Sequence, residues 1–321
     1  MTTTKYIIAS LALLMGLGSQ AQTPQIKFMA PGVYPEGVAY NNKNNMFYVS
    51  SVTTGTIGTV DMQGNYKTIY TDPSLKSTYG LKLDPKQNLL WACVSDGNYS
   101  QYSDSSTYKK MGRLIAIDII TGKKIHDINL AKQYKGQHFI NDMAFDATGN
   151  IYVTDSYSPV VYKIDKSGKA SVFAKSELFE SIDIGLNGIV YHPLGFLIVN
   201  NNSKGAIYKI DMKNPQNITR VKVKTLFPGA DGMLIGPGGS IIVVQNKSVD
   251  KVHQLTSTDN WQTAEVQGST TAEDRYQQPS TGTMANGQVY VLNSKMNELA
   301  DPTKHPSKEF SIQLVQFRPA K

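Results

Sequence analysis

Short apolar segments separated by polar turns run along the whole chain, and helical periodicity is nearly absent. Many of these segments are rich in Val, Ile, Leu, Tyr and Phe, and Gly, Pro, Asn and Asp stand between them, as is typical of β-strands joined by turns. The clearest apolar segments are Met46–Ser50, Leu89–Cys93, Ile151–Thr154, Phe196–Val199, Ile241–Val244 and Val289–Leu292. The pattern therefore predicts an all-β protein.

Each of these segments is preceded by another apolar strand, and the first residues of these preceding strands, here called openings, are similar to one another. The openings recur about every 45 residues. The six openings begin at Glu36, Tyr79, Asn141, Asn187, Asp231 and Thr281. Third and fourth strands follow in most units, and units of about 45 residues with four short strands are typical of β-propeller blades. The sequence thus predicts a six-bladed β-propeller with four antiparallel strands per blade. A two-sheet sandwich would not explain the period.

We expect the last unit to lack a fourth strand, because the given sequence ends soon after Phe317. The segment Gln25–Phe28 near the N-terminus is a spare strand. We expect it to pair with the last blade and close the ring, since closure removes exposed sheet edges.

The N-terminus has the features of an export signal. Lys5 precedes the apolar stretch Tyr6–Leu17, and Ser19, Gln20 and Ala21 form a small-x-small cleavage motif. We therefore expect a signal peptide over residues 1–21, cleaved near Ala21, and a single propeller domain over residues 22–321. The protein would be periplasmic or secreted. We identify no segment that is long and apolar enough to span a membrane.

Charge and cysteine content exclude some classes of function. The formal net charge is +7, but Lys and Arg are dispersed along the predicted strands and form no basic run, so we expect no nucleic-acid partner. The single cysteine, Cys93, lies inside an apolar strand and is expected to be a buried core residue. No feature of the sequence indicates a particular oligomeric state.

In a propeller the first strand of each blade lines the central channel, so the six opening residues should form a ring at one mouth of it. That ring holds two carboxylates and two amides, from Glu36, Asp231, Asn141 and Asn187. Oxygen ligands of this kind suit a hard cation such as Ca²⁺. Mg²⁺, Mn²⁺ and Zn²⁺ are kept as alternatives, although zinc prefers His or Cys. Each residue taken alone could instead be an ordinary turn former.

Four stretches of the sequence resemble the signature stretches of the SMP-30/gluconolactonase/luciferin-regenerating-enzyme family. They are Pro35–Gly37, Phe139–Asp142, Leu186–Gly188 and Ala230–Met233. The resemblance implies a six-bladed propeller over about residues 25 to 318, with one divalent metal ion. It also implies that Glu36, Asn141, Asn187 and Asp231 bind this metal, and that Asp231 is the catalytic base or positions the nucleophile.

The same resemblance implies a metal-dependent hydrolase, a lactonase or related esterase, that acts on a small-molecule substrate. One position departs from the family pattern. Sugar-acid lactonases of the family commonly carry Arg two residues before the first Asn, where this chain has Phe139. A more apolar substrate is therefore expected. The alternative is a non-catalytic propeller with a structural calcium ion that binds a ligand or a protein partner.

Several further features leave two interpretations open. The long segments 97–111 and 294–309 are either lids or surface decoration. The polar ends of the second strands are either close to the site or solvated loops; they are Ser51, Asp155, Asn201, Gln245 and Asn293. His138 lies three residues before Asn141, so it either reaches the site or is an exposed loop residue, and we expect the latter.

Overall fold

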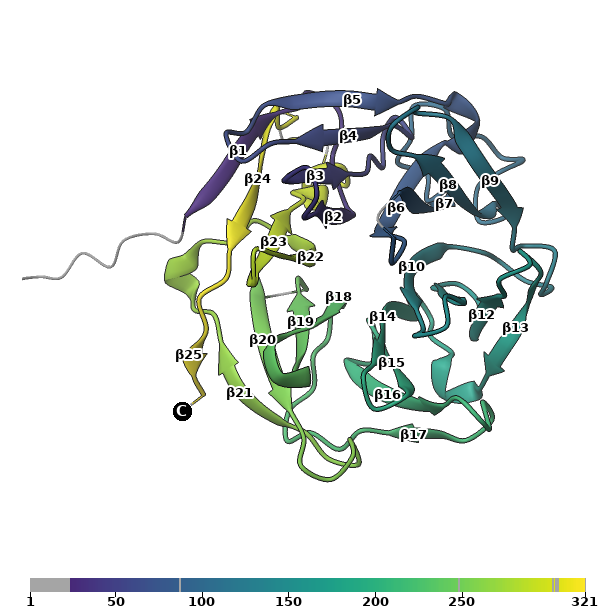
Figure 1. Ribbon diagram of the computed structural model, residues 1–321, viewed down its shortest axis with the longest axis vertical. Coiled ribbons are helices and arrows are strands. Elements are labelled where there is room, and N and C mark those ends of the chain that lie inside the picture. Colours follow the sequence, from purple (N-terminus) through teal and green to yellow (C-terminus); the bar gives the residue numbers. More distant parts are fainter. Residues whose placement is uncertain (1–23, 87, 248, 302, 304–305, 321) are drawn as a thin grey trace, which may run out of the picture.

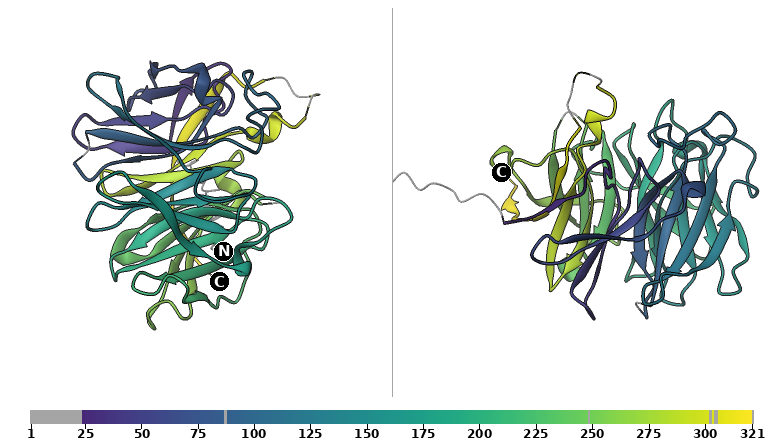
Figure 2. Two further views of the ribbon diagram at one scale, coloured as in Figure 1. Left: turned by 90° about the vertical axis from the view of Figure 1, so that its right-hand side faces the viewer. Right: turned by 90° about the horizontal axis from the view of Figure 1, so that it is seen from above.

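The computed structural model describes residues 24–86, 88–247, 249–301, 303 and 306–320. These residues form six antiparallel sheets arranged as a ring around a central axis (Figure 1). The side view in Figure 2 shows the sheets standing along this axis, with loops gathered on two opposite faces. The predicted six-bladed β-propeller is confirmed. The expected signal peptide, residues 1–21, lies outside the described residues.

Chain order follows blade order. The strands are β1 (Gln25–Met29), β2 (Val38–Asn41), β3 (Met46–Val49), β4 (Ile57–Val60), β5 (Tyr66–Tyr70), β6 (Ser77–Leu83), β7 (Leu89–Ser95), β8 (Gly112–Asp118), β9 (Lys124–Asn129), β10 (Ile140–Phe145), β11 (Ile151–Asp155), β12 (Val160–Ile164), β13 (Ala170–Lys175), β14 (Leu186–His192), β15 (Phe196–Asn201), β16 (Ala206–Asp211), β17 (Ile218–Arg220), β18 (Ala230–Ile235), β19 (Ile241–Gln245), β20 (Lys251–Thr256), β21 (Glu265–Ser269), β22 (Pro279–Ala285), β23 (Gln288–Asn293), β24 (Glu309–Leu314) and β25 (Arg318–Pro319).

Short 3₁₀ turns lie between some of the strands. Those between blades are η1 (Pro73–Leu75), η2 (Glu177–Phe179) and η4 (Ala272–Asp274), and those within a blade are η3 (Pro237–Gly239) and η5 (Met296–Glu298). Within the described part of the chain, no helix has the length and apolar character that a membrane span requires.

Strand β1 closes the ring as the sequence predicts. It pairs antiparallel with β24, from Gln25 opposite Gln313 to Met29 opposite Glu309. The blade that holds β22, β23 and β24 thus takes its outermost strand from the other end of the chain. The ring of Phe28 packs against Phe310 of the same blade and stacks on Tyr66 of the first blade, with 6.1 Å between ring centroids in both pairs.

The C-terminus adds a strand that the sequence did not predict. Strand β25 pairs with β21, the outermost of the four regular strands in the neighbouring blade, through Gly268 opposite Pro319 and Ser269 opposite Arg318. The Arg318 guanidinium also contacts the buried carboxylate of Asp274 at 2.8 Å. The two ends of the described chain therefore cover the outer edges of two adjacent blades.

Strands in the middle of a blade bury both faces between neighbouring blades. On β7, Leu90, Ala92 and Val94 pack in one hydrophobic cluster, and Trp91 and Cys93 pack in another. Alternate side chains of a strand point to opposite faces, so a strand sandwiched between two blades becomes a continuous apolar run. Cys93 is fully buried, as expected, and burial raises the pKa of its thiol well above the usual value.

Glycines allow the inner strands to approach one another closely around the axis. A Cβ atom at Gly37 would lie 2.2 Å from the carbonyl oxygen of Tyr79, and one at Gly188 would lie 2.4 Å from that of Asp231. Side chains at these positions would force neighbouring blades apart. The glycines therefore keep the central channel narrow where the opening residues face it.

Candidate metal centre

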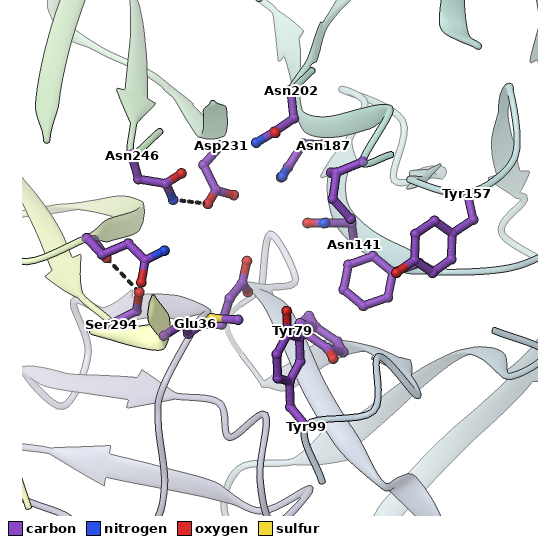
Figure 3. Close-up of a pocket in the computed structure, with 14 residues that line it drawn as sticks. Glu36, Tyr79, Tyr99, Asn141, Tyr157, Asn187, Asn202, Asp231, Asn246 and Ser294 are labelled. Carbon is purple, nitrogen blue, oxygen red and sulfur yellow. Dashed lines mark hydrogen bonds between the residues drawn. The ribbon is translucent and has the colours of Figure 1, made fainter. Parts of the chain in front are cut away.

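The four predicted ligands meet in one cavity at the centre of the ring. Glu36 lies just before β2, and Asn141, Asn187 and Asp231 lie near the start of β10, β14 and β18. All four line a cavity of about 180 Å³. Figure 3 shows their side chains pointing toward a common space from four different blades. Residues distant in the sequence are thus brought together as the repeat predicts.

A local break in strand pairing places three of these side chains, those of Asn141, Asn187 and Asp231. In β14, Leu186 pairs with Asn201 and the next pair is Ile189 with Val199, so Asn187 and Gly188 bulge out of the ladder. The same break occurs at Asn141 and at Asp231. A β-bulge redirects side chains and is frequent next to functional sites.

The ring differs from the prediction in the last blade. There the break lies between Pro279 and Gly282, so Ser280 occupies the position of the ligands and Thr281 the position taken by glycine in most blades. Thr281 was therefore wrongly placed in the ring by its sequence pattern. Ser280 donates a hydrogen bond to the backbone carbonyl oxygen of Glu36, at 2.6 Å, and so links the last blade to the first.

Buried carboxylates give the site a strong negative character. Burial raises the pKa of Glu36 well above its usual value, and the negative charges of Asp231 and Asp142 raise it further. Burial likewise raises the pKa of Asp231, to about 7, although the side-chain amides of Asn246 and Asn187 oppose the shift. The ammonium of Lys82 lies 3.9 Å from Asp142. The raised pKa values of Glu36 and Asp231 indicate that both carboxyl groups are unfavourable in their charged form unless a further cation is present.

Several oxygen atoms at the site have no hydrogen-bond partner in the described part of the protein. They include Glu36 Oε2 and Asn187 Oδ1, both buried. A buried acceptor without a partner is costly, on the order of 1–3 kcal/mol, more when it is charged. The amide nitrogen of Asn141 donates to Ser156 Oγ at 3.0 Å, which leaves the amide oxygen for another partner. A cation would satisfy these oxygens and balance the charge.

The donor set fits a hard cation. Two carboxylates and two amide oxygens are ligands typical of Ca²⁺, which takes six to eight oxygens including water. Among the described residues, no group of three or more His, Cys, Asp or Glu side chains is placed to hold a metal ion. The nitrogen and sulfur ligands that zinc prefers are therefore not gathered here.

Further polar residues line the cavity, one position after the strand ends for which the sequence left two interpretations open. The cavity is lined by Asn202, Asn246 and Ser294, each directly after a predicted strand end. Asn246 donates to Asp231 Oδ2, and Asn202 donates to the carbonyl oxygen of Ala230 at 3.0 Å. Their immediate predecessors instead brace loops: Asn201 donates to Phe179 O and Gln245 to Pro228 O. Side-chain alternation explains the offset.

His138 is not the exposed loop residue that the sequence suggested. It is buried, and its Nδ1 lies 2.8 Å from Asp155 Oδ2. The hydroxyl of Tyr162 donates to the same carboxylate oxygen at 3.1 Å. This pairing with a buried carboxylate, which no local sequence signal reveals, keeps His138 inside the blade.

Both long segments contribute to the cavity. Tyr99 comes from segment 97–111, and Ser294 and Met296 come from segment 294–309. Residues 302, 304 and 305 of the second segment lie outside the described part of the chain. Tyr79, Phe139 and Tyr157 line the same cavity, so aromatic rings form one of its sides (Figure 3).

Comparison with known proteins relates the chain to other propellers through its structure. A scan of protein-family models finds no match, and a search of curated proteins finds none. Similar solved structures include the major allergen Mala s 1 of Malassezia sympodialis, with 16% sequence identity, a TM-score of 0.72, and coverage of 92% of this chain and 97% of that one. The chain has the fold of these propellers.

Two other similar structures carry names from the family suggested by the sequence. A luciferin-regenerating enzyme has 13% identity and a TM-score of 0.63, with 92% of this chain and 98% of that one covered. A protein provisionally assigned as a gluconolactonase has 18% identity and a TM-score of 0.61, with 94% and 96% covered. The resemblance drawn from the sequence is thus confirmed at the level of the fold.

Proposed function

We propose that the protein is an exported metal-dependent hydrolase, a lactonase or related esterase, with one divalent cation bound at the propeller axis. The observation that carries the proposal is the convergence of Glu36, Asn141, Asn187 and Asp231 on one cavity. There, Glu36 Oε2 and Asn187 Oδ1 are buried and have no hydrogen-bond partner among the described residues. Propellers support many functions, so the fold supports this reading only weakly. The chemistry of the site is the stronger support.

The residues divide into two roles. Glu36, Asn141, Asn187 and Asp231 would hold the cation, with Ca²⁺ favoured by the oxygen ligands and Mg²⁺, Mn²⁺ or Zn²⁺ as alternatives. When bound, such an ion supplies Lewis-acid polarisation of a lactone or ester carbonyl.

Asp231 would also act on water. Its Oδ2 accepts a hydrogen bond from Asn246, which fixes the plane of the carboxylate. A carboxylate held in this way can orient a water molecule and accept its proton during attack on a carbonyl carbon. Glu36 is buried beside it, and we assign Glu36 to cation binding alone.

A hydrolysis panel tests the proposal. Lactones and esters would be incubated with wild type, with Asp231→Asn, and with Asp165→Asn as a control at a turn far from the cavity, each with Ca²⁺ and with chelator. We expect turnover that requires Ca²⁺, survives in Asp165→Asn and is lost in Asp231→Asn. Turnover in chelator, or an unaffected Asp231→Asn, would overturn the mechanism. Binding of one Ca²⁺ without turnover of any substrate would favour the non-catalytic propeller.

Export is a separate part of the proposal. It rests on the charged start, apolar stretch and small-x-small motif of residues 1–21. Expression of the full chain in a Gram-negative host, followed by N-terminal sequencing of the periplasmic fraction, should give a mature protein that begins at Gln22. An intact N-terminus found only in the cytoplasm would contradict export.

A further inference from the structure

The cavity has two chemically different sides. Its polar side holds Glu36, Asp231 and the asparagines, whereas its other side is built from the rings of Tyr79, Tyr99, Phe139 and Tyr157. The Phe139 ring lies 4.5 Å from the Tyr79 ring in an edge-to-face arrangement, and 5.3 Å from the Tyr157 ring, centroid to centroid. These contacts join three of the rings into an aromatic wall, and Tyr99 completes the aromatic lining of the cavity.

Buried hydrogen bonds hold the wall in place. Asp155 Oδ1 accepts from the backbone nitrogens of Phe139, at 2.8 Å, and of Tyr157, at 3.1 Å. The other oxygen of Asp155 is bonded to His138 and Tyr162, and the carboxylate is fully buried. One carboxylate thus fixes the backbone beneath two rings of the wall. Binding to a preformed wall avoids the entropic cost of ordering it.

The charge of the lining restricts the ligand further. Glu36 and Asp231 are the charged residues among those that the described structure places around the cavity, and no Lys, Arg or His is among them. The ammonium of Lys109, on segment 97–111, lies 4.9 Å from the Tyr157 ring centroid and is not part of the lining. An anionic substituent would meet aromatic rings and two carboxylates, without a cationic side chain to pair with.

We propose that the cavity takes a small neutral lactone or ester that carries an apolar, planar substituent, and that Phe139, Tyr157 and Tyr99 determine this specificity. This inference rests on the proposed hydrolase function. A protein cavity of about 150 Å³ can hold one benzene ring, so the cavity of about 180 Å³ has room for an aromatic ring beside the reacting group. The rings of the wall would pack against the substituent, edge to face or offset.

A matched pair of substrates tests the inference. The pair is γ-phenyl-γ-butyrolactone and γ-carboxy-γ-butyrolactone, which share the reacting ring and differ in the substituent. We expect wild type to prefer the phenyl compound in kcat/KM by at least about 10-fold. Phe139→Leu and Tyr157→Leu should each lower kcat/KM for the phenyl compound by about 2- to 10-fold, the range for one aromatic contact. Phe139→Arg should reverse the preference.

Calcium binding by titration calorimetry, unchanged in the three variants, would show that they fold and that the effect concerns the substituent. A wild type that hydrolyses the carboxylate compound as well as the phenyl compound would overturn the inference. So would a preference that Phe139→Leu, Tyr157→Leu and Phe139→Arg all leave unchanged.

A binding assay separates this inference from the proposed function. 3-Phenylcyclopentanone and 3-oxocyclopentane-1-carboxylate have the carbonyl but no ester bond. If no lactone is hydrolysed, the hydrolase proposal fails. Tighter binding of the phenyl ketone, weakened in Phe139→Leu, would still support the aromatic specificity. Equal binding of the two ketones, or no binding of either, would overturn it.

Discussion

The side-chain amide of Asn246 donates a hydrogen bond to Oδ2 of Asp231, and both residues belong to the same blade. Asp231 lies in the bulge of β18, and Asn246 follows the last residue of β19. The amide therefore supports the carboxylate from outside the predicted ligand set. It also opposes the effect of burial, which raises the pKa of Asp231 to about 7.

Removal of this support should weaken metal binding. In Asn246→Ala, the carboxylate of Asp231 loses the hydrogen bond that stabilises its charged form and restricts its orientation. Loss of such a supporting hydrogen bond typically lowers metal affinity by about 10- to 100-fold. Calcium titration calorimetry measures the change. Asn202→Ala is the matched control, because Asn202 lines the same cavity but donates to a backbone carbonyl oxygen. Equal affinities of the two variants would contradict the role given to Asn246.

Glu36→Gln should separate the effect of Glu36 on the stability of the metal-free protein from its effect on Ca²⁺ binding. Without Ca²⁺, the variant should be at least as stable as wild type, because it no longer buries a carboxyl group beside Asp231 and Asp142. With Ca²⁺ at 100 times its Kd, wild type should gain about 2.7 kcal/mol in the free energy of unfolding, and the variant should gain much less.

Urea unfolding with Ca²⁺ and with chelator measures both effects. Glu309→Gln, at an exposed glutamate on β24 that pairs with Lys27, is the control and should keep the gain. If Glu36→Gln gained as much as wild type from Ca²⁺, Glu36 would not be a ligand.

The sequence predicted the fold and the convergence of Glu36, Asn141, Asn187 and Asp231 because both follow from strand pattern. Each blade repeats the same apolar order, and each of these four residues stands at or just before the start of an inner strand. The features that it missed depend on tertiary geometry. In the sequence, Thr281 and Gly282 match the two residues that open the other repeats. In the structure, the pairing of β22 instead places Ser280 at the position equivalent to the predicted ligands. The role of Asn246 depends on which face of the strand end points inward. A shift of one residue decides which side chain faces the cavity, and strand boundaries predicted from sequence are uncertain by at least that much.

Closure of the ring by β1 should make Phe28 important for stability. Phe28 is 1% exposed and packs between Phe310 and Tyr66, so it joins the last blade to the first. Phe28→Ala should lower the free energy of unfolding by about 3–5 kcal/mol, the usual range for a buried Phe. Met29→Ala is the matched control on the same strand, since Met29 is 56% exposed. Chemical denaturation compares the two variants, and similar losses would show that β1 does not hold the ring closed.

His253 should make the protein less stable in mild acid. Burial lowers its pKa from 6.5 to about 4, with a smaller contribution from Lys251, and its ring nitrogens are bonded to Ser269 and Gln245. The unfolded chain therefore takes up a proton at higher pH than the folded protein does. Stability from this group is present above pH 6.5 and is lost as the pH falls toward 4.

Between pH 7.5 and pH 5 the loss attributable to His253 should be about 1–2 kcal/mol. Urea unfolding of wild type and His253→Gln at the two pH values measures it, and the variant should lose less stability than wild type by this amount. His126→Gln, at an exposed histidine on β9, is the control for the substitution itself. If His253→Gln and wild type lost the same stability on acidification, the titrating group would lie elsewhere in the protein.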